Sequence, residues 1–139
     1  MNHLNDFFIH LGKILREDLR FKEEAYLFVM ASLSRALRDL EKPRHINGTE
    51  LLVSIRAEAE DQFGPMATTV FQHWGIKNSL DFGEIVFNMV REGILSKKED
   101  DRLEDFKDSV FFENLFNHVS GYQLTSDEGM LKTPNLNSQ

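Results

Sequence analysis

The chain contains no cysteine, few prolines and glycines, and no long apolar run, and each absence excludes a class of protein. Without cysteine, its 139 residues can form neither a disulfide nor a thiolate metal site, and they offer no cysteine nucleophile. The 3 prolines and 8 glycines exclude a low-complexity linker. No apolar run approaches the roughly 20 residues of a membrane-spanning helix. Because residues 1–6 also lack the features of a secretory signal, we expect a cytoplasmic location without membrane contact.

The motifs that mark common enzymes and metal proteins are also missing. The chain has no G-x-S-x-G elbow, no P-loop, no G-x-G-x-x-G turn and no H-E-x-x-H pair. No two of the five histidines are spaced i, i+4, so no single helix presents a paired metal site. The acidic residues between 100 and 108 lack the spaced ligands and central glycine of an EF-hand loop. We expect no cofactor and no metal, and the sequence assigns no catalytic residue.

The chain is rich in apolar residues and in acidic residues. Hydrophobic residues make up 41% of it, including 12 phenylalanines, which is enough for one buried core. The net charge of −7 argues against general affinity for nucleic acid or anionic lipid. The length predicts one domain over residues 1–118. Because the apolar periodicity stops after residue 119, residues 119–139 are expected to form a loose tail.

Apolar residues recur at helical spacing along the first 118 residues, which predicts a mainly α-helical fold of about six helices. The expected helices cover residues 3–18, 22–40, 47–63, 65–74, 79–92 and 103–115. Asn47 and Glu50 have the spacing of a capping box at the start of the third helix. Gly75 and Gly93 are expected to end the fourth and fifth helices.

The stretch 65–108 has the order of elements of a helix-turn-helix with a wing: helix, glycine turn, helix, short strand and charged turn. Residues 94–95 are expected to form the strand, and residues 97–101 the turn of a small wing. The candidate nucleic-acid contacts are Lys97, Lys98 and Arg102. Between residues 78 and 108, however, nine acidic side chains oppose five basic ones. A DNA-contacting surface with a net negative charge repels the phosphates of DNA, so we expect no nucleic-acid partner.

The most basic stretch joins the end of the second helix to the third. Its candidate partner- or anion-binding residues are Arg35, Arg38, Lys42, Arg44 and His45. The same charges also suit a helix C-terminus and a solvated loop, so both interpretations stay open. An enzymatic site would need Arg44 and His45 to meet His73 beside a carboxylate.

Several short motifs lie between Phe21 and Phe112. They are residues 24–29 (EAYLFV), 44–52 (RHINGTELL), 62–67 (QFGPMA), 73–76 (HWGI), 81–88 (DFGEIVFN), 93–96 (GILS) and 105–106 (DF). In this combination the chain resembles a family of bacterial proteins of unknown function, the planctomycete–verrucomicrobial conserved hypothetical type. The resemblance implies a small single-domain bacterial protein, and it brings no activity, cofactor or partner.

Together these observations favour a small non-enzymatic interaction or regulatory protein with a protein partner. The first alternative is a winged-helix-like nucleic-acid-binding protein that uses the basic stretch and the wing lysines. The second is an enzyme with a site near Arg44, His45 and His73. The sequence does not predict an oligomeric state.

Overall fold

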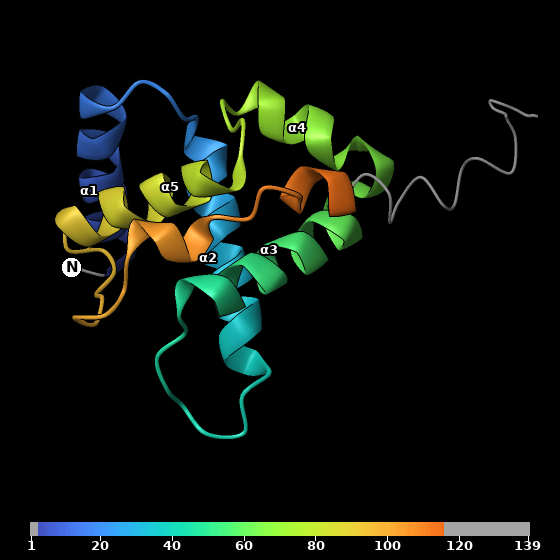
Figure 1. The fold of residues 1–139 in the computed structure, drawn as a ribbon. Helices are drawn as coiled ribbons and strands as arrows, with labels where there is room; N and C mark the ends of the chain where they lie inside the picture. The colour runs from blue at the N-terminus through green and yellow to red at the C-terminus, as the bar shows by residue number, and fades with distance from the viewer. Residues whose placement is uncertain (1–2, 116–139) are drawn as a thin grey trace, which may run out of the picture.

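The computed structural model describes residues 3–115, which are mainly helical and contain no β-strand (Figure 1). The five α-helices of this part are α1 (His3–Glu17), α2 (Glu23–Arg38), α3 (Gly48–Phe63), α4 (Ala67–His73) and α5 (Ser79–Arg91). Two short 3₁₀ helices are η1 (Gly64–Met66) and η2 (Leu103–Phe106). Residues 111–115 are again helical at the end of the described part.

The central helix of the described part is α5, which contacts α1, α2, α3 and η2 (Figure 1). Its apolar residues recur at helical spacing, so that Phe82, Ile85 and Met89 are completely buried. Of its 13 residues, only Arg91 is exposed. The helix that the sequence places at the reading position of a helix-turn-helix is therefore largely covered by its neighbours.

The apolar stripes predict one core cluster of Phe28, Leu33, Ile55, Phe63, Val70, Phe71, Trp74, Ile85, Val86 and Met89. Most of that prediction is confirmed, and the exception is Val70, which is partly buried and lies outside the core cluster. The residues that are buried as predicted are Phe28, Ile55, Phe71, Ile85 and Met89. The residues that are partly buried and pack against the core are Leu33, Phe63, Trp74 and Val86. Phe71 lies at the centre of an aromatic group, with its ring centroid 5.4 Å from that of Phe28 and 5.2 Å from that of Phe82.

The predicted helix ends are formed by local hydrogen bonds. The Glu50 amide donates to Asn47 Oδ1 at 2.8 Å and the Asn47 amide donates to Glu50 Oε1 at 3.0 Å, which confirms the capping box of α3. Gly75 and Gly93 follow α4 and α5 with φ of 92° and 79°. Ile76 donates its amide back to the Phe71 carbonyl at 2.9 Å, as in a Schellman motif.

The predicted wing is wrong for the described residues, because the strand at residues 94–95 does not form. The amides of Ile94 and Leu95 both donate to the Met89 carbonyl, at 2.8 and 3.2 Å. These bonds close the end of α5 and use the donors that a strand would have offered to a partner. The chain then runs back along the start of α3, where the Phe106 ring fills the space left by Gly48 and Gly83.

The predicted last helix, over residues 103–115, is interrupted. Ser79, the first residue of α5, donates its hydroxyl to the Phe106 carbonyl at 2.5 Å and accepts from the Asp108 amide at 2.9 Å. These tertiary hydrogen bonds hold residues 107–108 out of a helix, between η2 and the helical residues 111–115. The predicted tail and residues 116–118 of the predicted domain lie outside the described residues. Among the described helices, none has the length and apolar character needed to cross a membrane.

Candidate functional site

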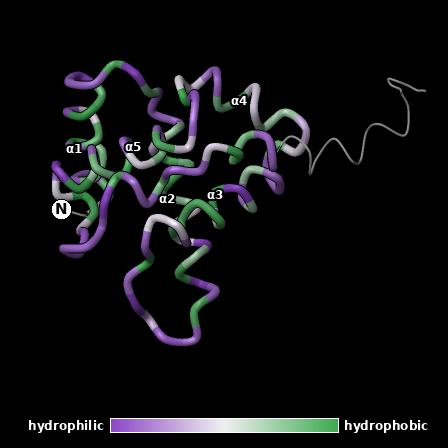
Figure 2. The backbone as a smooth tube through the Cα atoms, in the orientation of Figure 1, coloured by the Kyte–Doolittle hydropathy of each residue, from purple (hydrophilic) through white to green (hydrophobic). Residues whose placement is uncertain are grey.

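A cavity of about 190 Å³ opens between the second half of α2, the start of α3, α5 and residues 95–106. Leu33 and Leu37 lie one turn apart on α2, and Val86 and Val90 lie one turn apart on α5. Each helix therefore contributes two neighbouring side chains on one face to the cavity. The full apolar lining is Leu33, Leu37, Ile46, Leu51, Val86, Phe87, Val90, Leu95 and Phe106. The cavity is therefore predominantly hydrophobic, whereas the connection between α2 and α3 beside it is mostly hydrophilic (Figure 2).

Polar side chains from two segments far apart in the sequence surround the mouth of this cavity. They are Arg44, His45, Asn47, Ser96, Lys97, Asp101, Arg102 and Asp105. His45 Nε2 lies 2.6 Å from Asp101 Oδ2, and this contact joins the α2–α3 connection to the segment after α5. The same carboxylate oxygen accepts the Lys98 amide at 2.7 Å. The two segments thus close one side of the cavity together.

A polar, more open hollow adjoins the cavity at the same two segments. Its lining is Arg44, His45, Asn47, Thr49, Lys98, Asp100, Asp101 and Asp105. His45 and Asp101 line both spaces, so a molecule in the cavity would have the polar hollow next to it. No group of three or more histidine or carboxylate ligands in the described part of the chain is arranged to hold a metal ion.

Arg44 is held in place by the cap of α3. Its guanidinium donates to both carboxylate oxygens of Glu50, at 3.0 and 2.7 Å, and to the His45 carbonyl at 3.0 Å. The hydrogen bonds from the Arg44 side chain and the Asn47 amide lower the pKa of Glu50 to about 2. The capping box and the ion pair therefore fix the loop that forms one wall of the mouth.

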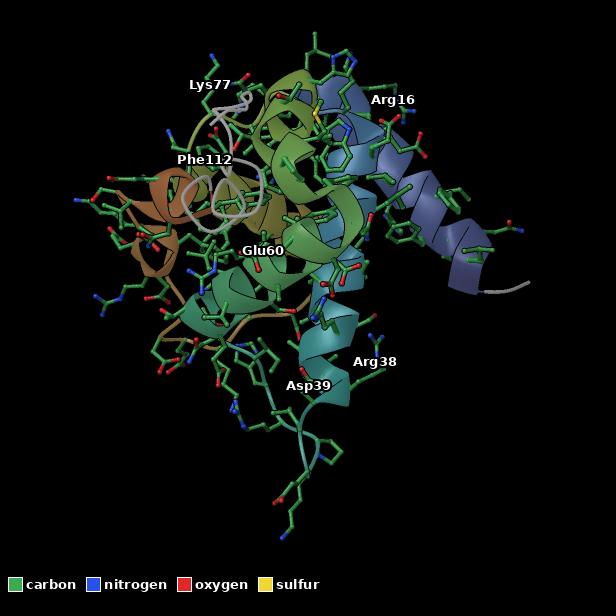
Figure 3. The ribbon with its side chains drawn as sticks, turned by 90° about the vertical axis from the view of Figure 1, so that its right-hand side faces the viewer. Arg16, Arg38, Asp39, Glu60, Lys77 and Phe112 are labelled. Atoms are coloured by element: carbon green, nitrogen blue, oxygen red, sulfur yellow. The ribbon has the colours of Figure 1, made fainter. Side chains whose placement is uncertain are left out.

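The other basic candidates are dispersed. Arg35 donates to Glu58 at 3.1 Å and to Asp61 at 2.6 Å, so α3 neutralises its charge away from the cavity. Arg38 is exposed at the end of α2 (Figure 3), and Lys42 is exposed in the following loop.

The candidate wing residues lie at the mouth beside Arg44 and His45. Lys97 and Arg102 line the cavity, and Lys98 lines the polar hollow. The structure thus joins members of two sets that the sequence keeps separate: the basic loop after α2 and the charged segment after α5.

His73 lies apart from this site. It is exposed on α4, at the opposite end of the molecule from the α2–α3 connection (Figure 1), and lines a shallow hollow with Thr69, Gln72 and Trp74. Of the three residues in the enzyme hypothesis, only Arg44 and His45 share a cavity. The sequence gives no sign of Asp101 as the partner of His45, because it lies in an acidic run typical of a solvated turn.

A buried polar cluster on the other side of α5 is also unexpected from the sequence. Asn88 donates to Asp18 at 2.9 Å and to the Tyr26 hydroxyl at 3.0 Å, and it accepts from Arg91 at 2.8 Å. The hydrogen bonds from Arg20 hold the pKa of Asp18 well below its usual range, and burial raises the pKa of Tyr26. This cluster holds the α1–α2 connection against α5, so its role is structural.

No protein-family model, curated protein or solved structure matches the chain. The resemblance over residues 21–112 therefore stays a prediction.

Proposed function

We propose that this protein is a small, non-enzymatic interaction domain that receives one apolar side chain of a protein partner in the cavity between α2, α3 and α5. The apolar cavity with its polar mouth carries the proposal. Protein interiors pack at the density of organic crystals, so an accessible apolar space is a place for an apolar group from outside. Anchor side chains of partners typically fill such pockets at the centre of an interface.

The size of the cavity indicates the kind of ligand. Pockets for drug-sized molecules and cofactors measure about 300–1,000 Å³. The cavity here measures about 190 Å³. An apolar cavity of roughly 150 Å³ can hold a benzene ring. One phenylalanine or leucine side chain therefore suits this space better than a cofactor or a metabolite does.

The polar groups at the mouth support binding more than catalysis. His45 and Asp101 contact each other, and Arg44 contacts Glu50 through both of its terminal nitrogens. These contacts position two loops around an apolar space. His73, the third group that the enzyme hypothesis requires, lies at the other end of the molecule.

A peptide-display selection on the immobilised protein tests the proposal. The test variant is Leu37→Trp, which adds bulk at the cavity on a side chain that is already 43% exposed. The matched control is Leu27→Trp, on the same helix, where the leucine is 38% exposed and lies outside the cavity lining.

Selected peptides should share one aromatic or aliphatic position and bind the control like the wild type. Their affinity for Leu37→Trp should fall by about tenfold or more, because a blocked anchor pocket removes the main contact. Equal binding to both variants, or no enrichment over an unrelated immobilised protein, would refute the proposal. Thermal melts of both variants show whether they fold.

A further inference from the structure

We infer that the cavity recognises an apolar side chain with a carboxylate beside it, as the free C-terminal residue of a partner chain provides. In this inference Lys97 and Arg102 bind the carboxylate. It rests on the proposed function and specifies the chemistry of the partner.

The carboxylates that line the cavity are already engaged. Asp101 accepts from His45 and from the Lys98 amide, and Asp105 accepts from the Arg102 amide at 3.0 Å. Neither is opposed to an ammonium or guanidinium group at the mouth. A partner's carboxylate would therefore not have to displace either of these carboxylates from an ion pair in order to approach Lys97 and Arg102.

The cations that line the cavity differ in what they contact. Arg44 already forms a two-point ion pair with Glu50. Within residues 3–115, Lys97 Nζ donates only to the Lys98 carbonyl, at 3.2 Å, and the Arg102 guanidinium has no ion-pair partner. Two cationic groups thus remain at the edge of an apolar space, where a carboxylate on an apolar body meets both requirements at once.

The acidic residues near Lys97 and Arg102 favour a ligand with a single negative charge over a ligand with several. Exposed Glu99, Asp100 and Glu104 flank Lys97 and Arg102 in the sequence and oppose a phosphate-rich ligand. In a ligand with one carboxylate next to an apolar group, the apolar group supplies most of the binding by filling the cavity. The carboxylate then needs contacts only with the two cationic groups beside the cavity. A C-terminal phenylalanine or leucine has both groups on one residue.

Two probes that differ only at the carboxylate test the inference. N-acetyl-L-phenylalanine carries the acid, and N-acetyl-L-phenylalaninamide replaces it with a neutral amide. Each is titrated into the isotope-labelled full chain, and the shifts of backbone amides that line the cavity give Kd. At low salt the acid should bind about three- to tenfold more tightly, the range expected of two exposed ion pairs. Added salt should reduce this difference.

The outcomes separate the two proposals. If both probes shift the cavity amides with equal Kd, the carboxylate inference fails and the apolar pocket stands. If neither probe shifts the cavity amides, the proposed function fails as well. If the acid binds more tightly but shifts amides elsewhere, the assignment to this cavity is wrong.

Charge-removing variants test the assignment of residues. The double variant Lys97→Gln, Arg102→Gln should abolish the difference between acid and amide. Both side chains belong to exposed residues, so their replacement leaves the core intact. The matched control is Lys77→Gln, an exposed lysine far from Arg38 and the α2–α3 connection (Figure 3), and it should keep the preference for the acid. A preference for the acid that survives in the double variant would overturn the inference.

Discussion

At the scale of single residues, Glu50 connects the local structure of α3 to the proposed binding site. It caps the helix through the Asn47 amide and binds the guanidinium of Arg44 at the mouth of the cavity. Both contacts need the ionised carboxylate. The free energy of unfolding should therefore depend on pH through this side chain.

The replacement Glu50→Gln should flatten the acid part of the stability curve. The pKa of Glu50 is about 2 in the folded protein and 4.5 without these contacts. Its contribution is therefore complete above about pH 4.5 and is lost as the pH falls towards 2. Urea unfolding midpoints between pH 2 and pH 7 give the slope, which should be smaller in the variant. Part of the slope should remain, because the pKa of Asp18 is also lowered. Identical slopes would show that Glu50 does not gain stability from these contacts.

At the scale of elements, two glycines that end helices provide a matched comparison. Gly75 ends α4 and Gly93 ends α5, and both have positive φ. A Cβ on Gly93 meets no atom within 4 Å, whereas a Cβ on Gly75 would overlap the Arg20 carbonyl oxygen. Gly93→Ala should cost about 1–2 kcal/mol through backbone strain. Gly75→Ala should cost about 1–3 kcal/mol more, because the α1–α2 connection must move. Chemical denaturation of both variants measures the difference, and equal losses would contradict the overlap.

The elements that the sequence predicts correctly are those whose signals are local. A capping box needs residues only three apart, and a glycine stop depends on its own φ and on carbonyls one turn back. The strand at residues 94–95 is predicted wrongly, because the Met89 carbonyl satisfies the amides of Ile94 and Leu95. The last helix is also misjudged, since its interruption depends on Ser79, which is 27 residues away from Phe106.

At the scale of the whole molecule, the candidate site depends on a fold that no local pattern encodes. Arg44 and His45 are predicted as candidates because a basic loop is visible in the sequence. The contact of His45 with Asp101 spans 56 positions. The cavity walls are formed by apolar residues of the helices. The sequence pattern assigns these residues to the core in the same way as every other apolar residue at helical spacing. Only the packing of α2 against α5 shows that Leu37 and Val90 border an open space.

The helix-turn-helix order of α4 and α5 should not confer DNA binding, because the fold places its parts differently. A reading helix must be exposed along one face to enter the major groove. In α5 Arg91 alone is exposed, and the other twelve residues are buried or partly buried, so α5 presents no exposed face. Ion pairs further reduce the number of cations that the basic stretch can offer to phosphates. Arg35 is bound by Glu58 and Asp61, and Arg44 is bound by Glu50. Arg38 and Lys42 remain as its unpaired cations in the described part of the chain.

Fluorescence anisotropy with a random-sequence duplex at low salt is the appropriate measurement, since electrostatic binding is strongest there. We expect no salt-sensitive binding at micromolar protein, because the two unpaired cations of the basic stretch neutralise too few phosphates and the net charge of −7 opposes approach. Micromolar binding that weakens with salt would contradict this expectation. Its loss on changing Arg35, Arg38, Lys42 and Arg44 to Ala would place the interface on the basic stretch. Its persistence in that variant, with loss on changing Lys97 and Arg102, would place DNA at the mouth of the cavity instead.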